Sequence, residues 1–368
     1  MKKIIECSTA IAEAVKLCNI KVIPIYPITP QTHIPEEIAK FVNDDEMNVE
    51  LIYAESEHSM LSAAIGASAT GVRVFTATSS QGLAYTFENL FIASGLRLPI
   101  VMVNVNRALS SPLNIWCDHS DSISARDSGW LQFYVESSQE AFDTVIQAYK
   151  IAEQINLPVI VCVDGFTLSH VYEPVEILEK NKVNSFLPEY KAKFKLDVNK
   201  PITIGAVVDQ SKFMQFKKQQ QDAMLDSIKI IKKVNIEFKN KFKRSYGNGL
   251  IETYNLKNKK KAIIAMGSIC GTIRVLSGKL KNFGLIKIRC FRPFPKQELI
   301  NICKNLKELI IIDKNISIGN EGALASEVKS VLFNKKIKIK SFIMGLGGKD
   351  VTLKDLEKTL KNKEGWIL

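Results

Sequence analysis

The stretch Pro99-Ile100-Val101-Met102-Val103-Asn104-Val105 is an almost wholly apolar run of strand length, and it decides the fold class. A second run of this kind stands at Leu157-Pro158-Val159-Ile160-Val161-Cys162-Val163, and residues 140–154 between the two have helical periodicity. Apolar strands that alternate with helices predict a parallel sheet covered on both faces. We therefore expect an α/β fold whose functional groups lie at the carboxyl ends of the strands.

The alternation of strands and helices continues on both sides of this core. On the N-terminal side, helical segments separate three further apolar runs, at residues 22–26, 49–53 and 72–76. On the C-terminal side, residues 224–242 carry apolar side chains at helical spacing with Lys and Glu between them, which predicts a long amphipathic helix. The intervening residues 176–200 are charged and irregular.

A second set of strands and helices occupies the C-terminal part of the chain. It begins with a strand at residues 262–268 and continues with three more, at 285–288, 308–312 and 337–339. A lysine-rich segment separates it from the first set. We therefore predict a first domain over residues 1–240, a linker over 241–260 and a second domain over 261–368.

Composition and charge exclude several classes of protein. The chain has 368 residues, of which 46% are hydrophobic, and a net charge of +12. No apolar run approaches the roughly 20 residues needed to span a bilayer, and Glu6 and Glu13 interrupt any signal-peptide core. The basic excess lies late in the chain, at residues 239–244 and 257–261, without a nucleic-acid-binding signature. We expect a cytoplasmic protein that binds neither membrane nor nucleic acid, with a solvated basic face or a docking surface for acidic proteins.

The seven cysteines do not form a metal-binding pattern. None belongs to a C-x-x-C pair, so neither zinc nor an iron–sulfur cluster has a ligand set on this chain. Their neighbours are apolar, which predicts reduced and mostly buried thiols. We predict no metal site.

Three polar segments follow predicted strands. Tyr26-Pro27-Ile28-Thr29-Pro30 is a rigid turn that presents one hydroxyl, although turn punctuation alone would explain it. Glu55-Ser56-Glu57-His58-Ser59 places two acids and a histidine at a strand end. Ser56 is expected to cap the helix that follows, and the dipole of this helix would favour one glutamate in its first turn.

The third polar segment contains an arginine directly after the buried strand. Arg107 could hold a carboxylate through a bidentate fork, or it could form a structural ion pair with Asp118, Asp121 or Asp127. His119 lies between two of these acids, and we interpret it as a hydrogen-bonded structural histidine rather than a metal ligand. Dinucleotide, P-loop and G-x-S-x-G motifs are all missing. The residues alone thus predict an α/β enzyme with a site near Thr29, Glu57 and Arg107.

At these residues the chain closely resembles the alpha subunit of the pyruvate:ferredoxin oxidoreductase family. The resemblance covers nearly the whole chain, in segments that occur in order. They are Tyr-Pro-Ile-Thr-Pro at 26–30, Ser-Glu-His-Ser at 56–59, Thr-Ala-Thr-Ser-Ser-Gln-Gly-Leu at 76–83, Ala-Ser-Gly-Leu-Arg-Leu-Pro-Ile-Val-Met at 93–102, Asn-Arg-Ala-Leu-Ser at 106–110, Asn-Ile-Trp-Cys-Asp-His-Ser-Asp at 114–121, Arg-Asp-Ser-Gly-Trp at 126–130, Asp-Gly-Phe-Thr-Leu-Ser-His at 164–170 and Phe-Arg-Pro-Phe-Pro at 291–295.

The resemblance implies a fold and a cofactor. The first domain would be a parallel-sheet domain that binds the pyrimidine ring of thiamine diphosphate, and the second would resemble the C-terminal domain of transketolase. Glu57 matches the family's catalytic glutamate, which bonds the pyrimidine ring nitrogen and thereby activates the cofactor toward the 2-oxo group. Thr29 and Arg107 match residues around the substrate, with Arg107 placed for its carboxylate. Pro27 and Ile115 match positions that line the cofactor and substrate pocket.

The resemblance also implies partners. The clamp for Mg²⁺ and diphosphate, typically Gly-Asp-Gly, is missing here, because Asp164-Gly165 has no glycine before it. In this family the clamp and a cluster lie on a beta subunit, and further iron–sulfur clusters lie on a ferredoxin-like delta subunit beside a gamma subunit. The chain would therefore be active only as a complex. Lys314 follows Asp313 where the family pattern has Asp-Arg, a departure that would alter a subunit contact.

The implied reaction is the oxidative decarboxylation of pyruvate with coenzyme A to acetyl-CoA and CO2, with electrons passed to ferredoxin. The same chemistry on branched-chain 2-oxoacids is an alternative, because sister enzymes share most of these motifs. From another class, a non-catalytic basic binding protein would also account for the charge.

Overall fold

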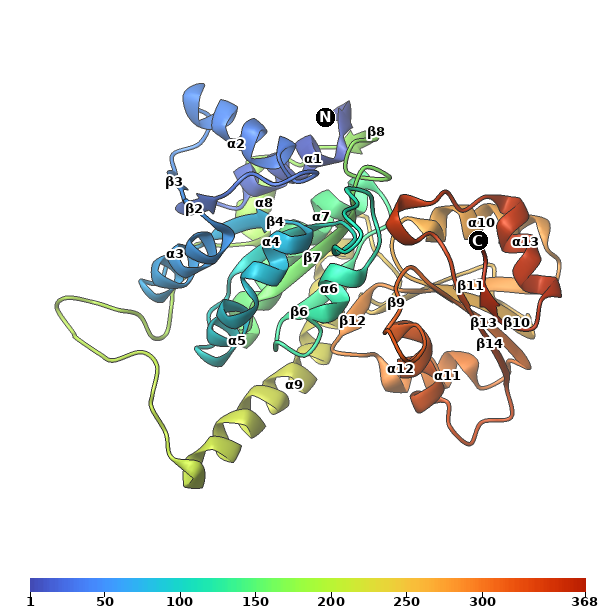
Figure 1. Cartoon of the computed structure of the whole chain (residues 1–368). Helices are drawn as coiled ribbons and strands as arrows, with labels where there is room; N and C mark the ends of the chain where they lie inside the picture. Colours follow the sequence, from blue (N-terminus) through green and yellow to red (C-terminus); the bar gives the residue numbers. More distant parts are fainter.

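Strand β5 (Val101–Asn106) forms the middle of the first sheet, as its apolar sequence predicts. The computed structural model describes all 368 residues and has two α/β bodies side by side (Figure 1). In the first body, β5 pairs in parallel with β4 (Phe75–Thr78) on one side and with β7 (Val159–Asp164) on the other. β6 (Leu131–Tyr134) adds to β7 in parallel, and β12 (Cys290–Arg292) closes that edge in the antiparallel direction.

Two further strand pairs complete the first body. β2 (Val22–Ile25) and β3 (Glu50–Tyr53) are parallel and continue the sheet beyond β4 through a bridge between Val22 and Val74. β1 (Lys2–Glu6) and β8 (Tyr172–Glu176) form a separate antiparallel pair. The predicted parallel α/β architecture is therefore confirmed.

Helices cover both faces of this sheet. Their bounds are α1 (Cys7–Leu17), α2 (His33–Asn43), α3 (Glu57–Ala69), α4 (Ser80–Tyr85), α5 (Phe87–Gly95), α6 (Ser120–Ser124), α7 (Ser138–Ile155), α8 (Lys180–Phe186) and α9 (Gln210–Phe242). None of the helices in the chain is long and apolar enough to cross a membrane.

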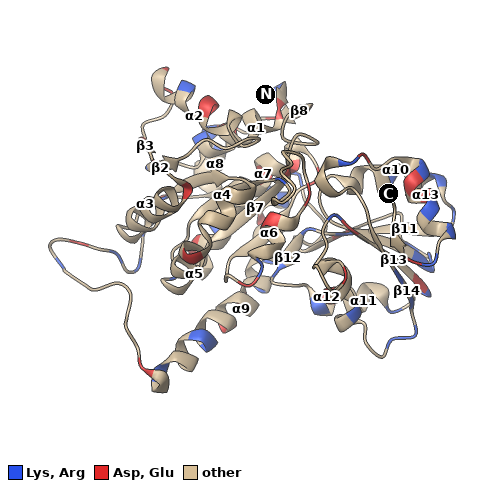
Figure 2. Cartoon of the chain, in the orientation of Figure 1, with Lys and Arg blue, Asp and Glu red and all other residues tan.

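The second body contains a sheet with the order β15-β14-β13-β10-β11-β9. Its strands are β9 (Ile251–Tyr254), β10 (Lys261–Ala265), β11 (Phe283–Ile288), β13 (Glu308–Asp313), β14 (Lys338–Ile343) and β15 (Gly365–Trp366), and all pair in parallel except β9. Its helices are α10 (Ile269–Lys279), α11 (Lys296–Cys303), α12 (Ala323–Val331), the 3₁₀ turn η1 (Leu346–Gly348) and α13 (Leu353–Lys361). Many Lys and Arg positions lie in the helices and loops of this body, including α13 (Figure 2).

Several segments differ from the prediction. The predicted linker 241–260 contains β9, an edge strand of the second sheet, because a four-residue strand with one buried apolar side chain, Ile251, has no apolar signature. α8 lies in the stretch 176–200 that was expected to be irregular. α9 begins at Gln210, well before Met224, because its first turns are exposed and carry no buried face. The short buried strand β6 was not predicted at all.

The two bodies share one hydrophobic core. A single cluster of 82 buried residues runs from the first sheet, through residues such as Val103, to Ile311 of β13. β12 also crosses from the second part of the sequence to pair with β6 of the first sheet. Residues 188–209 contain no helix or strand, and much of this segment extends away from the shared core, as does the N-terminal half of α9 (Figure 1). The relative placement of the two bodies is thus fixed by packing rather than by a free linker.

Candidate functional site

The polar residues that the sequence singled out lie at one edge of the first sheet. Thr29 stands in the turn after β2, Glu57 begins α3 after β3, and Arg107 follows β5. Because these strands are parallel, their carboxyl ends meet at the same edge. The three residues therefore share one edge of the sheet, as the sequence predicted, and the side-chain contacts show which groups are free there.

The turn that carries Thr29 is held on β4 by Gln31. The fully buried Gln31 donates its amide to the carbonyl of Ala77 at 2.9 Å, and its oxygen accepts from the backbone N–H of Ile28 at 3.2 Å. Pro27 and Thr29 remain exposed, and the Thr29 hydroxyl has no hydrogen-bond partner in the chain. A rigid turn thus presents an available hydroxyl.

Glu57 is a buried carboxylate without a partner. Ser56 caps α3 by accepting from the backbone N–H of Ser59 at 3.2 Å, as the sequence predicted, and this places Glu57 in the first turn, where the helix dipole favours an anion. Glu57 is only 8% exposed, yet its carboxylate forms no ion pair or hydrogen bond within the chain. The neighbouring Glu55 is exposed and bonded to Ser59. Burial without a partner leaves the Glu57 carboxylate available to a ligand.

A glycine makes room beside this carboxylate. A Cβ atom at Gly82 would lie 2.7 Å from Oε1 of Glu57 and 2.5 Å from Oγ1 of Thr78, so only glycine fits between them. The Thr78 hydroxyl is buried and also lacks a hydrogen-bond partner. Two unpartnered polar groups therefore border the same glycine at the end of β4.

Asp121 organises the segments around the site. Its buried carboxylate accepts from the backbone N–H groups of Ser80 at 3.0 Å and Arg107 at 3.1 Å, and from the side-chain amides of Asn104 at 3.0 Å and Asn106 at 2.7 Å. Burial raises the pKa of Asp121 although these donors act to lower it. Ser80 has a positive φ of 50°, a strained conformation that the bond to Asp121 helps to hold.

Arg107 carries a cation that no carboxylate neutralises. The residue is 9% exposed, and its guanidinium donates to two carbonyl oxygens, those of Asn114 and Thr29, each at 3.0 Å. It forms no ion pair with Asp118, Asp121 or Asp127, so the structural ion pair that the sequence left open does not form. Asp121 binds its backbone instead. The remaining N–H groups of a buried guanidinium are suited to an incoming anion.

The contacts bring some predicted residues together and not others. Thr29 and Arg107 touch directly. Glu57 forms no hydrogen bond with either of them. It borders Gly82 of the segment 78–82, in which the Ser80 hydroxyl donates to the carbonyl of Ala108 at 2.7 Å. Ile115 is 41% exposed and sits in the loop beside Arg107. The sequence did not predict the supporting roles of Gln31 and Asp121. Gln31 directly follows the quoted segment 26–30, and Asp121 was considered only as a possible ion-pair partner of Arg107.

The second body supports the loop that carries Ile115. The amide of Asn114 donates to the carbonyl of Gly347 at 3.1 Å, and the N–H of Gly348 donates to the carbonyl of Cys117 at 2.7 Å. A Cβ at Gly348 would lie 2.2 Å from Cβ of Trp116. The second body, which carries none of the predicted site residues, therefore fixes one wall of the site.

A buried ion pair joins the two bodies beneath this loop. The ammonium of Lys314 lies 2.8 Å from Asp164 Oδ2, and the imidazole of His119 lies 2.8 Å from Oδ1 of the same carboxylate. Burial alone would raise the pKa of Asp164, but Lys314 and His119 hold it well below its ordinary value. Cys117, His119 and Asp164 could otherwise bind a metal, but Lys314, also 3.4 Å from Sγ of Cys117, supplies the counter-charge. His119 is thus a hydrogen-bonded structural histidine, as predicted.

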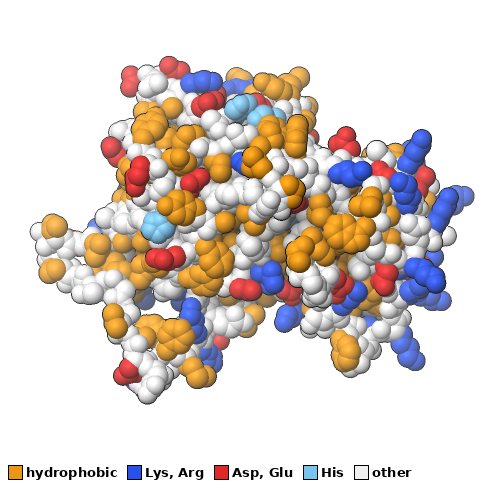
Figure 3. Space-filling model, in the orientation of Figure 1, with side chains coloured by type: hydrophobic (Ala, Val, Ile, Leu, Met, Phe, Trp, Pro, Cys, Tyr) orange, Lys and Arg blue, Asp and Glu red, His pale blue; other side chains and the backbone are white.

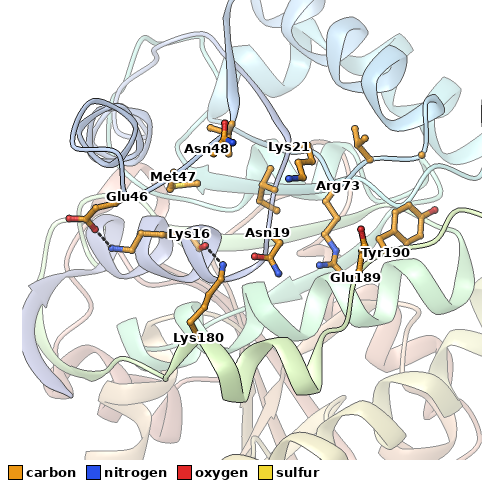
Figure 4. Close-up of a pocket in the computed structure, with 14 residues that line it drawn as sticks. Lys16, Asn19, Lys21, Glu46, Met47, Asn48, Arg73, Lys180, Glu189 and Tyr190 are labelled. Atoms are coloured by element: carbon orange, nitrogen blue, oxygen red, sulfur yellow. Dashed lines mark hydrogen bonds and ion pairs between the residues drawn. The ribbon is translucent and has the colours of Figure 1, made fainter.

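Another pocket opens at the opposite edge of the sheet. It has a volume of about 460 Å³ and lies at the amino ends of β2, β3 and β4 (Figure 4). Its cations are largely engaged already: Lys16 pairs with Glu46 at 2.7 Å, and Arg73 pairs with Glu153. It is separate from the site residues and contains none of them.

The residues present fit one end of thiamine diphosphate and not the other. Glu57, free of partners and bordered by Gly82, offers a carboxylate to the pyrimidine ring. A diphosphate clamp needs an available carboxylate with Mg²⁺. Asp164, in the only Asp-Gly pair that the sequence raised for this role, is fully engaged by Lys314, His119 and Ser268. Within this chain, Glu57 is thus free to meet a ligand, whereas Asp164 is not free for a diphosphate clamp.

Comparisons with known proteins match both parts of the chain to one family. Residues 13–235 match the family described as "Pyruvate flavodoxin/ferredoxin oxidoreductase, thiamine diP-bdg", and residues 260–356 match "Pyruvate:ferredoxin oxidoreductase core domain II". The pyruvate synthase subunit PorA of Methanocaldococcus jannaschii is 51% identical, over 98% of this chain and 95% of the relative. The ketoisovalerate oxidoreductase subunit VorA of Pyrococcus horikoshii is 43% identical, over 97% of this chain and 92% of the relative.

Solved structures share the fold. The 2-oxoglutarate:ferredoxin oxidoreductase from Magnetococcus marinus superposes with a TM-score of 0.75 at 17% identity, over 98% of this chain and 65% of that chain. A split-gene transketolase superposes with a TM-score of 0.54 at 12% identity, over 98% of both chains. The fold is therefore a thiamine-diphosphate-binding α/β domain followed by a transketolase-like domain, as predicted. From the matched domains and the relatives that align along almost its whole length, the chain belongs to the pyruvate flavodoxin/ferredoxin oxidoreductase family.

Proposed function

We propose that the chain is the pyrimidine-binding, alpha-type subunit of a pyruvate synthase that oxidatively decarboxylates pyruvate with coenzyme A. The observation that carries the proposal is the unneutralised guanidinium of Arg107, which lies at the same sheet edge as the unpartnered carboxylate of Glu57. One group suits the carboxylate of a 2-oxoacid and the other suits a protonated ring nitrogen.

Glu57 is the proposed catalytic residue. When bound, thiamine diphosphate supplies the carbon that attacks the 2-oxo group and takes up the electrons released on decarboxylation. Glu57 accepts a hydrogen bond from the pyrimidine ring nitrogen and keeps a proton there. Its burial strengthens this bond because the local dielectric is low.

The other site residues position the substrate. Arg107 binds the 2-oxoacid carboxylate through its free N–H groups, while its bonds to the carbonyls of Thr29 and Asn114 keep the guanidinium in place. Thr29 contacts that guanidinium through its backbone carbonyl, and its unpartnered hydroxyl hydrogen-bonds the substrate. Pro27 and Ile115 line the pocket of cofactor and substrate.

Partner chains complete the enzyme. A beta subunit supplies the clamp for Mg²⁺ and diphosphate, and gamma and ferredoxin-like delta subunits complete a cytoplasmic complex whose iron–sulfur clusters pass electrons to ferredoxin. The proposal is supported by the engaged state of Asp164 and by the seven cysteines, all of which are buried and, as predicted, unpaired on this chain. The relatives' names as subunits point in the same direction.

Pyruvate is favoured over a branched-chain 2-oxoacid by the relatives. Pyruvate synthase subunits are 51%, 46% and 44% identical to the chain in three methanogens, whereas the ketoisovalerate relatives reach 43%. Rates of the complex with pyruvate, 2-oxoisovalerate and 2-oxoglutarate test this choice, and a higher kcat/KM for 2-oxoisovalerate would reverse it. A non-catalytic basic binding protein, the remaining alternative, has no support from the family.

The role of Glu57 is tested by Glu57→Gln in the purified complex. We expect reduction of an artificial electron acceptor by pyruvate and coenzyme A to fall by about 100-fold or more, the size of a lost acid–base contribution. Glu55→Gln is the matched control, because Glu55 is exposed two residues away, and its rate should be unchanged. Assembly, checked by size-exclusion chromatography, should be the same for both. A Glu57→Gln complex with near-normal turnover would contradict the proposed function.

A further inference from the structure

Three potential metal ligands from distant parts of the sequence converge on the surface of the first body. Glu6 ends β1, His33 begins α2, and His170 lies in the connection between β7 and β8. The donor atoms of the three side chains all lie within 4.8 Å of one another. Histidine side chains reach the surface in the upper part of the face shown in Figure 3.

Both imidazoles direct the same nitrogen at the same oxygen. Nδ1 of His33 lies 2.7 Å from Oε1 of Glu6, and Nδ1 of His170 lies 4.0 Å from that oxygen. The two rings face each other with centroids 4.4 Å apart. Two nitrogens and one oxygen therefore surround one small volume.

The backbone around these ligands is tied in place. Glu6 pairs with Tyr172 in the antiparallel ladder of β1 and β8. The backbone N–H of Ser8 donates to the carbonyl of Ser169 at 3.0 Å, and the Ser8 hydroxyl donates to it at 2.9 Å. Glu6 and His170 are thus held in register before any ligand arrives, which reduces the entropy cost of binding.

The charges favour a cation at this place. Neither a lysine nor an arginine pairs with Glu6, unlike Asp164 in the buried Cys117–His119–Asp164 cluster, where Lys314 is the counter-charge. The side chains of Glu6, His33 and His170 are 12%, 46% and 24% exposed, so an ion can reach them from solvent.

From this arrangement we propose that Glu6, His33 and His170 form a binding site for a divalent transition metal of the zinc type. Two nitrogens and one carboxylate oxygen suit Zn²⁺, whereas Mg²⁺ and Ca²⁺ prefer oxygen ligands. Donors around a tetrahedral Zn²⁺ lie about 3.4 Å apart, from bond lengths of 2.0–2.2 Å. The two nitrogen–oxygen distances of 2.7 and 4.0 Å bracket this value, and each differs from it by about 0.7 Å or less.

The fourth position is left to water on the exposed side. The hydroxyl of Ser169, 2.7 Å from Nδ1 of His170, turns its hydrogen away when that nitrogen binds the ion. The bound metal joins β1, the start of α2 and the β7–β8 connection, and so adds a cross-link to the folded state. The site lies outside the residues proposed for pyruvate chemistry and does not depend on that proposal.

Zinc titration of the metal-free, full-length chain tests the site. Equilibrium dialysis near neutral pH should show one Zn²⁺ per chain bound at micromolar concentration, with no competition from excess Mg²⁺. His33→Ala and His170→Ala should each raise the Kd for Zn²⁺ by about 100-fold or more. This loss is larger than that expected for a residue that only hydrogen-bonds a metal ligand. Both residues are exposed enough that the variants fold.

His58→Ala is the matched control, because His58 is the remaining histidine outside the two clusters. Its zinc affinity should equal that of the unchanged chain. Saturating zinc should also raise the Tm of the unchanged chain and of His58→Ala, but not that of the His33→Ala/His170→Ala double variant. Equal zinc binding by the double variant, or no stoichiometric zinc bound to the unchanged chain, overturns the proposal and leaves an ordinary Glu6–His33 ion pair.

Discussion

Replacing Lys314 by Met should strongly destabilise the folded chain. Lys314 is buried and pairs with Asp164 across the two bodies at 2.8 Å. Methionine fills a similar volume without the charge, so the variant leaves the Asp164 carboxylate buried and without its ammonium. Removing one partner of a buried pair typically costs about 3–5 kcal/mol.

The surviving contacts of Asp164 set where in this range the cost falls. The imidazole of His119 at 2.8 Å and the hydroxyl of Ser268 at 2.5 Å still reach the carboxylate. These contacts recover part of the lost stabilisation, so we expect the free energy of unfolding to decrease by about 3 kcal/mol. An exposed ion pair contributes far less to the free energy of unfolding than a buried one. Lys329→Met, which breaks the partly exposed pair with Glu321, should cost about 0.5 kcal/mol or less and is the matched control.

The assay is urea denaturation of the full-length chain, followed by circular dichroism, with the free energy of unfolding extrapolated to water. A double variant, Asp164→Asn with Lys314→Met, removes both charges. It should be more stable than Lys314→Met alone, because no uncompensated charge stays buried.

The loss should depend on pH. In the unchanged protein the pKa of Asp164 lies below its unfolded value, so its contribution is present above the unfolded pKa and is lost only as the pH falls through the lower folded pKa. Without Lys314, burial favours the protonated acid, so the variant loses less at acidic pH than at neutral pH. Two outcomes would show that the reasoning about this buried pair is wrong. The first is a free energy of unfolding of Lys314→Met within about 1 kcal/mol of that of the unchanged chain at neutral pH. The second is a difference in this free energy that increases as the pH is lowered.

Two further predictions concern the site. Gly82→Ala should reduce turnover of the complex by about 10-fold or more without unfolding the chain, because its Cβ would lie 2.7 Å from Oε1 of Glu57. Gly66→Ala, whose Cβ would meet no atom within 4 Å, should retain activity and gain up to about 1 kcal/mol of stability from helix propensity. Equal turnover of the two variants in steady-state assays would contradict this prediction. Arg107→Lys should raise the KM for pyruvate by about 10-fold or more, because lysine cannot form the two parallel hydrogen bonds that a guanidinium makes with a carboxylate. Arg126→Lys, at a partly exposed arginine, is the control and should leave this KM unchanged. An unaltered KM in Arg107→Lys would show that the substrate carboxylate does not bind to Arg107.

The relation between sequence and site is clearest at Glu57 and Arg107. Both follow apolar strands, and an apolar run followed by a polar residue is a local pattern that can be recognised within a few residues. The sequence also predicted the Ser56 cap, because capping involves neighbours three residues apart. It left open whether Arg107 forms an ion pair, since that depends on where the 114–121 loop folds.

The amino-acid sequence by itself thus determined the α/β class, most strands and helices, and the sheet edge that carries Thr29, Glu57 and Arg107. Only the tertiary structure decided that β12 returns to the first sheet, that Lys314 pairs with Asp164, and that Glu6, His33 and His170 converge. The physical reason is the range of the interactions. Periodicity and capping involve near neighbours and are therefore visible as local patterns in the sequence. Contacts between residues 100 or more positions apart, such as Lys314 and Asp164, have no local pattern and are seen only in the folded structure.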